Sequence, residues 1–188
     1  MRRLQAAVVI LLVLSVVVSA WAQSLLHWTF DGGPDGWRVV FGPGQIRTTI
    51  AREHIRVGTG ALECSYEIAP RTYFAVTKAV SIPDQPLITL SFWMKSMKTT
   101  HLGVFLTERD GSGYGYLLAV PVGQWKQVAI NSKQFTLDRS NPTNKDENGR
   151  LDVGQIAYIT VADLTGLSAG QRSPASFYLD DFKVGGPK

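Results

Sequence analysis

Two adjacent aspartates, Asp180 and Asp181, lie in the middle of an otherwise apolar segment, residues 176–184. Because side chains alternate between the two faces of a strand, we expect Asp180 to share a face with Phe182 and Asp181 to share the other with Leu179. Whichever face is buried, one carboxylate is buried with it, and an ionised carboxylate is costly in an apolar layer unless it is satisfied. The segment therefore predicts a partner for a buried carboxylate, which can be a cation, backbone N–H groups or an arginine.

The other acidic and nucleophilic residues do not form a recognisable catalytic set. Glu63 and Glu67 share a strand face with Ser65, but the two carboxylates would stand about 13 Å apart by the rise of a strand. That separation exceeds the spacing that retaining glycosidases use. The three histidines stand alone, without metal-ligand spacing. Cys64 is the only cysteine, lies in an apolar pattern and has no histidine beside it. The sequence therefore predicts that the protein is not an enzyme.

The elements that must position these residues are predicted to be strands. Roughly ten short segments rich in Val, Ile, Thr and aromatic residues are separated by Gly, Pro, Asn and Asp, a pattern typical of a β-sandwich or barrel. In residues 87–97, Ile88, Leu90, Phe92 and Met94 form one apolar face, and the opposite face carries Thr89, Ser91, Trp93, Lys95 and Met97. No segment holds an apolar 3.6-residue period long enough for a major helix. We therefore expect a single all-β domain.

The first residues predict export. Two arginines are followed by an apolar run, residues 6–20, and by the small-x-small sequence Ala20-Trp21-Ala22. This is the pattern of a secretory signal peptide, residues 1–22, whose removal leaves residues 23–188 as a secreted or periplasmic protein. An uncleaved anchor is the alternative, but about 15 apolar residues are few for a membrane span. Loss of the two arginines lowers the formal net charge from +4 to +2, and this balance does not suggest nucleic acid as a partner.

Several short motifs along the chain resemble a known family when they are taken in order. They are FDGGPDGW, GTGALECSY, LSFWMKS, GQWKQVAI and FYLDDFKV. This order is similar to that of galactose-binding-like jelly rolls, the fold of many carbohydrate-binding modules and of complex I intermediate-associated-type domains. The resemblance extends over residues 25–184. It implies an all-β fold, a β-sandwich jelly roll of two antiparallel sheets, and non-catalytic binding of a polysaccharide.

The same resemblance implies a structural calcium where the first and last strands meet. The implied ligands are Asp31, Gly58, Gly60 and Asp180. Calcium takes six to eight hard oxygen ligands, which here would be the two carboxylates and backbone carbonyls of the glycine turn. The alternative is that Asp180 accepts backbone N–H bonds or pairs with Arg52 or Arg56.

Sugar binding would require aromatic rings bordered by side chains that form directional hydrogen bonds. We expect the following residues to line one sheet: Arg47, Arg71, Tyr73, Trp93, Lys95 and Tyr116. Trp93 is either an exposed stacking platform or a ring covered by a loop. The competing function is a secreted protein-interaction or assembly domain of the same fold with no sugar ligand. Large exposed apolar patches would favour a protein partner, and a groove of rings bordered by charges would favour a glycan.

Overall fold

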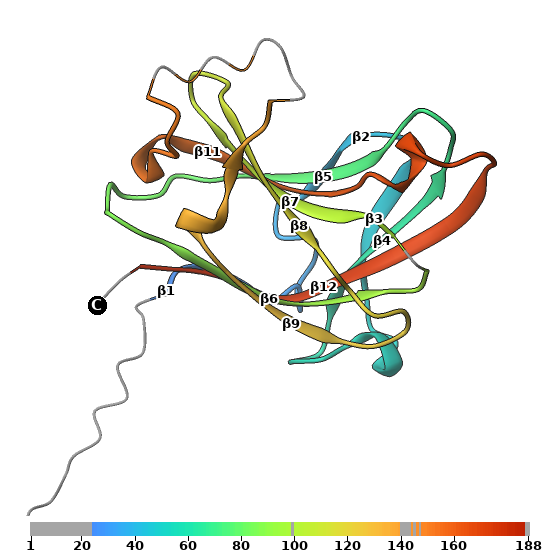
Figure 1. Cartoon of the computed structure of the whole chain (residues 1–188). Helices are drawn as coiled ribbons and strands as arrows, with labels where there is room; N and C mark the ends of the chain where they lie inside the picture. The colour runs from blue at the N-terminus through green and yellow to red at the C-terminus, as the bar shows by residue number, and fades with distance from the viewer. Residues whose placement is uncertain (1–23, 99, 140–143, 145, 147, 187–188) are drawn as a thin grey trace, which may run out of the picture.

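The protein folds into two antiparallel β-sheets that face each other (Figure 1). The computed structural model describes residues 24–98, 100–139, 144, 146 and 148–186. Within these residues the helical elements are four single 3-10 turns, η1(Arg52–His54), η2(Ser132–Gln134), η3(Val153–Gln155) and η4(Thr165–Leu167), and no helix is long and apolar enough to span a membrane. The expected all-β sandwich is confirmed, whereas the expected signal peptide, residues 1–22, lies outside the described residues.

The first sheet, sheet A, has the strand order β3-β4-β12-β6-β9, and β1 also pairs with β12. Its strands are β1(Ser24–Trp28), β3(Gly44–Thr49), β4(Ala61–Ile68), β6(Thr89–Ser96), β9(Lys126–Asn131) and β12(Ser173–Gly185). The long strand β12 is central: β4 pairs with its first half and β1 with its last residues, while β6 runs along its other edge. The segment that carries the two aspartates thus lies in the middle of sheet A.

The second sheet, sheet B, has the strand order β10-β8-β7-β11-β5-β2. Its strands are β2(Arg38–Phe41), β5(Phe74–Ala79), β7(Leu102–Glu108), β8(Gly113–Leu118), β10(Thr136–Leu137) and β11(Ile156–Asp163). In Figure 1 this sheet forms the upper layer, above sheet A. Its outer face therefore points away from the core.

The core fills the space between the two sheets with alternate side chains of each strand. Phe92 stacks on Phe182 with ring centroids 4.6 Å apart, and Trp37 packs against Phe182 at 5.3 Å. Trp28 meets Trp37 edge-on at 6.0 Å, so the two tryptophans join the N-terminal segment to the core. Cys64 is fully buried, as expected for a small structural residue, and burial raises the pKa of its thiol well above the usual value.

A β-bulge in β12 overturns the expected arrangement of the aspartates. The register of β12 against β6 shifts between Asp180 and Lys183, and Asp181 adopts a left-handed backbone with φ of 50°. The extra residue reverses the alternation of side chains. Leu179 and Phe182 are both fully buried in the core, and the prediction that Asp180 shares a face with Phe182 is wrong. Asp180, next to core residue Leu179, therefore points to the outer face of sheet A, and the bulge after it returns Phe182 to the core.

A connection between β3 and β4 covers that outer face. We call residues 50–60 the covering loop, and it contains η1. The His54 ring stacks on Tyr178 with centroids 4.1 Å apart, and Lys95 Nζ donates a hydrogen bond to the Glu53 carbonyl at 2.8 Å. Tyr178 and Lys95 are consequently buried although they point away from the core.

Candidate functional site

The outer face of sheet B, in contrast, is hollowed into a groove of about 880 Å³. Side chains of all six strands of the sheet line it, together with residues of the connections that follow β10 and β11. In each longer strand the alternate positions enter the core, because successive side chains point to opposite faces. The groove is therefore positioned by strand register rather than by one contiguous motif.

Small residues form the floor of the groove. Ala75, Ala162 and Gly103 lie side by side on three neighbouring strands. Phe41 pairs with Ala75 at one end of this row, and Leu117 pairs with Gly103 at the other. Four inter-strand steps separate Phe41 from Leu117, a span of about 19 Å at the usual strand spacing. The row forms an elongated trough across the strands, with larger side chains at both ends.

One aromatic ring lies flat on this floor. A methyl group at Gly103 or at Gly115 would come within 2.9 Å of the Phe105 ring, which shows that the ring extends over both glycines. Side chains at these positions would lift the ring off the sheet. Phe105 therefore presents a ring face to the groove, a geometry suited to stacking on the apolar face of a planar or ring-shaped ligand.

A stacked pair of rings forms one wall. Phe41 and Tyr73 lie with centroids 4.0 Å apart and planes inclined by 12°. Gly42 makes this approach possible: its φ is +81°, and a methyl group there would lie 2.3 Å from the Tyr73 carbonyl oxygen. Elsewhere the rim is aliphatic, and the side chains of Leu117 and Leu167 are 67% and 57% exposed. The groove thus combines rings with exposed apolar rims.

Polar groups also reach the groove. Thr107 and Thr160 line it near the middle, and Thr136 lines it at β10. Within the described residues its charged lining is Asp138 and Arg139, both just after β10. The groove therefore offers hydroxyl groups, which can both donate and accept hydrogen bonds, beside its aromatic rings.

Two of the six residues predicted for sugar binding lie at or near this groove. Tyr73 lines it directly and points outward, as the alternation of side chains in the sequence predicted. Arg71 lies in the preceding turn with φ of 62°, and its N–H donates a hydrogen bond to the Gly166 carbonyl at 2.8 Å. That bond joins the turn to the connection that carries Leu167.

Three others lie on the opposite side of the molecule, on the outer face of sheet A. Arg47 pairs with Glu63 at 2.9 Å. The Arg56 guanidinium lies 4.4 Å from the centre of the Trp93 ring, and Lys95 is buried under the covering loop. Trp93 is therefore a ring contacted by a loop, which was one of the two alternatives for it.

Tyr116 points into the sandwich, where its ring lies 6.1 Å from Phe135 and packs against the core. The expectation that the six residues line one sheet is therefore wrong, because alternation within a strand does not tell which sheet the strand joins. Sequence reasoning missed Phe41, Phe105 and Leu117. The available signal was Gly113 and Gly115 alternating with core residues in β8.

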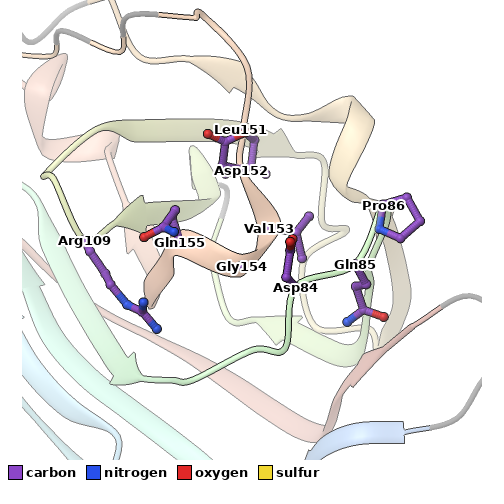
Figure 2. A pocket seen from close by; sticks show the side chains of 9 residues that line it. All are labelled: Asp84, Gln85, Pro86, Arg109, Leu151, Asp152, Val153, Gly154 and Gln155. Atoms are coloured by element: carbon purple, nitrogen blue, oxygen red, sulfur yellow. The ribbon is translucent and has the colours of Figure 1, made fainter.

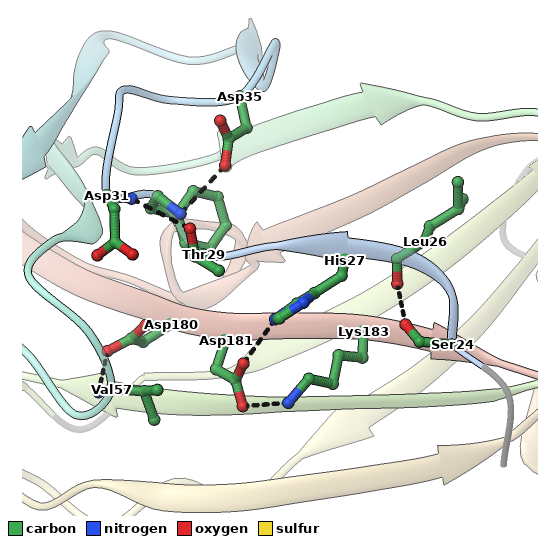
Figure 3. Close-up of polar contacts among 11 residues, drawn as sticks. Ser24, Leu26, His27, Thr29, Asp31, Asp35, Val57, Asp180, Asp181 and Lys183 are labelled. Carbon is green, nitrogen blue, oxygen red and sulfur yellow. Dashed lines mark hydrogen bonds and ion pairs between the residues drawn. The ribbon is translucent and has the colours of Figure 1, made fainter. Parts of the chain in front are cut away.

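The buried aspartate is held by the covering loop. Asp180 Oδ2 accepts a hydrogen bond from the backbone N–H of Val57 at 2.8 Å (Figure 3). It also accepts one from the backbone N–H of Arg56 at 2.7 Å. Its other oxygen, Oδ1, is buried and has no hydrogen-bond partner among the described residues. Burial raises the pKa of this carboxyl above its usual value. Asp181, by contrast, pairs with His27 and Lys183, each at 2.7 Å.

Asp31 binds the same loop from the other side. Asp31 Oδ1 accepts hydrogen bonds from the N–H groups of Thr59 at 2.6 Å and Gly60 at 2.9 Å, and the carboxylate lies directly against Gly58. The hydrogen bond from the Thr59 backbone is the main cause that lowers the pKa of Asp31. The four residues implied as calcium ligands, Asp31, Gly58, Gly60 and Asp180, thus all lie at or against the covering loop. No group of three or more His, Cys, Asp or Glu side chains within the described residues could hold a metal by itself.

A separate hollow of about 900 Å³ opens at one end of the sandwich, between the β5–β6 connection and η3 (Figure 2). Its charged lining consists of Arg109, Asp84 and Asp152. These opposite charges offset one another, and we assign no ligand to this hollow.

Comparison with solved structures places the fold. The family 11 carbohydrate-binding module of the cellulosomal cellulase Lic26A-Cel5E of Clostridium thermocellum superposes with a TM-score of 0.65 at 18% identity, over 87% of this chain and 96% of the module. This chain and that module share the same β-sandwich fold. The family 11 module from Clostridium thermocellum in complex with a β-1,3-1,4-mixed-linked tetrasaccharide matches with a TM-score of 0.65 at 19% identity, over 86% and 95% of the two chains.

A third match is the CBM22-1 xylan-binding domain of Paenibacillus barcinonensis Xyn10C, with a TM-score of 0.57 at 12% identity, over 87% of this chain and 94% of that domain. These likenesses confirm the β-sandwich jelly roll. No family model and no curated protein matches the sequence.

Proposed function

We propose that the protein is a non-catalytic domain that binds a polysaccharide chain in the groove on the outer face of sheet B. The observation that carries this proposal is the flat Phe105 ring on a floor of small residues, with the Phe41–Tyr73 pair at one end. A pyranose ring has apolar faces and hydroxyl edges, so ring faces and the groove hydroxyls match both parts of it. The trough, about 19 Å long by strand spacing, leaves room for several sugar residues.

Two of the matched structures support this proposal by what they bind, a mixed-linked tetrasaccharide and xylan. Their identity to this chain is below 20%, so the shared fold does not tell which sugar this chain binds. The groove residues of this chain therefore have to be tested directly. Catalysis is not part of the proposal, since the acidic residues do not form a pair across the groove: Asp138 is its one acidic lining residue within the described part.

The test is affinity electrophoresis of the purified protein in gels that contain β-glucan, xylan or mannan, followed by calorimetry on the best ligand. Replacing Phe105 or Tyr73 by alanine should weaken binding by about two- to tenfold, the range expected for one aromatic contact. Trp93→Ala is the matched control, because it removes a larger ring from sheet A. Retention of full affinity in both groove variants, or loss only in Trp93→Ala, would contradict the proposal.

The aliphatic rim supports a second candidate, a protein partner in the same groove. Val40, Leu117 and Leu167 are each more than half exposed and lie around one hollow, and clustered apolar surface is typical of protein contacts. If no polysaccharide retards the protein in the gel, and Leu117→Ser changes its self-association in analytical ultracentrifugation, this second function is favoured.

We further propose that a calcium ion stabilises the covering loop. The supporting observation is Asp180 Oδ1, a buried carboxylate oxygen that has no hydrogen-bond partner among the described residues. Asp180 lies in β12 and binds the covering loop through Oδ2, and Asp31 binds the same loop. A bound cation would satisfy this oxygen and offset its burial, with carbonyls such as those of Gly58 and Gly60 completing the ligand set. The N–H groups already bound to both carboxylates are the competing arrangement.

A thermal melt in calcium and then in excess EDTA tests this proposal. A ligand at a hundred times its dissociation constant adds about 2.7 kcal/mol to the free energy of unfolding, which raises the midpoint by about 5–10 °C for a domain of this size. The shift should disappear in Asp180→Ala and remain in Asp84→Ala, which changes an exposed aspartate elsewhere. An unchanged midpoint on adding EDTA to the parent protein would refute calcium binding.

We also propose that the protein is exported, on the pattern of residues 1–22 alone. The mature protein recovered from the secreting cell should begin at Gln23, which intact-mass measurement would show. A mass that corresponds to the full chain would instead indicate an uncleaved anchor.

A further inference from the structure

The groove continues beyond β10 into a second hollow. This hollow has a volume of about 890 Å³ and shares three lining residues with the groove: Thr136, Leu137 and Arg139. Because the same side chains border both hollows, the two hollows adjoin along β10. We call this second hollow the β10 pocket.

The charged lining of the β10 pocket is entirely positive within the described residues. It consists of Lys133 in η2, Arg139 after β10, and Arg150 in the connection before η3. All three side chains are exposed, and no ion pair joins any of them to a carboxylate of a described residue. Two other arginines differ in this respect, since Arg47 and Arg172 each pair with a glutamate.

Two acidic residues of the same connection, Asp146 and Asp152, are occupied by hydrogen bonds to other groups. Asp146 accepts hydrogen bonds from the Tyr114 hydroxyl and from the N–H groups of Asn148 and Gly149. Asp152 accepts from Asn148 Nδ2 at 3.1 Å. These carboxylates hold the connection together, and neither of them lines the β10 pocket. Among the described residues, the three cations therefore line the pocket without an acidic side chain in its lining.

Three like charges around one hollow repel one another, and an anion bound between them would relieve that repulsion. Arginine in particular binds carboxylate and sulfate groups through paired, charge-assisted hydrogen bonds. We propose that the β10 pocket binds an anionic substituent, a carboxylate or a sulfate, on the polysaccharide that occupies the groove. This inference rests on the proposed function, and it makes an acidic glycan the preferred ligand.

Binding to matched pairs of polymers tests the inference. Glucuronoxylan is compared with the same polymer after carboxyl reduction, and a sulfated galactan with its desulfated form, by calorimetry on the purified protein. The acidic member of one pair should bind several-fold tighter at low salt, and its advantage should shrink as salt is raised. Which pair shows the advantage identifies the anion as carboxylate or sulfate.

Variants then assign the effect to the pocket. Lys133→Gln and Arg150→Gln, which change residues that line the β10 pocket but not the groove, should each weaken binding of the acidic polymer by about two- to fivefold, the range for one exposed ion pair. The same changes should leave binding of the neutral polymer unaltered. Arg52→Gln is the matched control, since it removes an equal charge from an exposed position in η1 on the other sheet.

Equal binding of the acidic and neutral polymers, or an equal loss in Arg52→Gln, would overturn the inference while leaving polysaccharide binding in place. Failure of every polymer to bind would overturn the proposed function and the inference together. The two failures are distinguished by Phe105→Ala, which should weaken both members of a pair if the groove binds glycan.

Discussion

Glu108, a buried carboxyl at the end of β7, provides a direct test of the electrostatics of the fold. It ends β7, is 4% exposed, and accepts the backbone N–H of Asp152 through Oε1. Burial, together with the nearby carboxylates of Asp146 and Asp110, raises its pKa from 4.5 to about 7. The folded protein therefore holds a proton on Glu108 in a pH range where the unfolded chain has released it.

The raised pKa of Glu108 makes the free energy of unfolding depend on pH, and proton linkage gives the sign and the size of this effect. Because the folded pKa is the higher one, the stabilising contribution is fully present below about pH 4.5 and is lost as the pH rises through about 7. A difference of about 2.5 pH units corresponds to about 3 kcal/mol of unfolding free energy for this buried group. The variant Glu108→Gln keeps an acceptor oxygen and cannot ionise, so its free energy of unfolding should not fall in this way as the pH rises.

Urea denaturation of the parent protein and of Glu108→Gln at several pH values between 4.5 and 7.5 measures the difference. We expect the variant to gain about 3 kcal/mol relative to the parent across that interval. Glu53→Gln, which removes an exposed carboxylate, is the matched control. If the difference between parent and Glu108→Gln stays constant with pH, the assignment of a raised pKa to Glu108 is wrong.

Three further substitutions test other parts of the argument. Gly115→Val should displace the Phe105 ring from the groove floor and weaken glycan binding by about two- to tenfold in calorimetry, with a folded circular dichroism spectrum. Tyr66→Phe removes the hydroxyl that donates to buried Asp163 and should cost about 2 kcal/mol, a fall in melting temperature of about 4–8 °C; an unchanged midpoint would show that this bond is not stabilising. Asp181→Val places a β-branched residue at φ of 50° and should destabilise the protein by about 2 kcal/mol more than Asp181→Asn, measured by urea denaturation.

The fold was predictable because its signals are local. Apolar alternation and turn residues identify strands one at a time, and the jelly roll is confirmed by the solved structures of similar fold. The bulge at Asp181 was not predictable in this way. It depends on how β12 meets β6, β1 and the covering loop at once, and a single extra residue reverses the facing of every position that follows.

The groove was harder to predict than the strands that build it. Alternation along the strand predicted that Tyr73 faces outward. The Phe105 ring, in contrast, can lie on the groove floor only because its partner on the next strand is Gly115. That pairing is a property of register between strands, which a single sequence does not display. Trp93 and Lys95 fit the sugar-binding pattern equally well, yet the covering loop contacts both.

The two sheets of this sandwich thus use their outer faces differently. On sheet A, the covering loop buries Tyr178 and binds Asp180, so this face contributes to stability. On sheet B, the floor of small residues and the flat Phe105 ring remain open, so this face is available to a ligand. Because the two faces lie on opposite sides of a packed core, we expect a change at Asp180 to affect folding and, under the proposed function, a change at Phe105 to affect glycan binding. The Asp180 oxygen that lacks a partner among the described residues and the open groove are therefore separate features of the molecule. Calcium binding at Asp180 would not be evidence for glycan binding in the groove, and glycan binding would not be evidence for calcium.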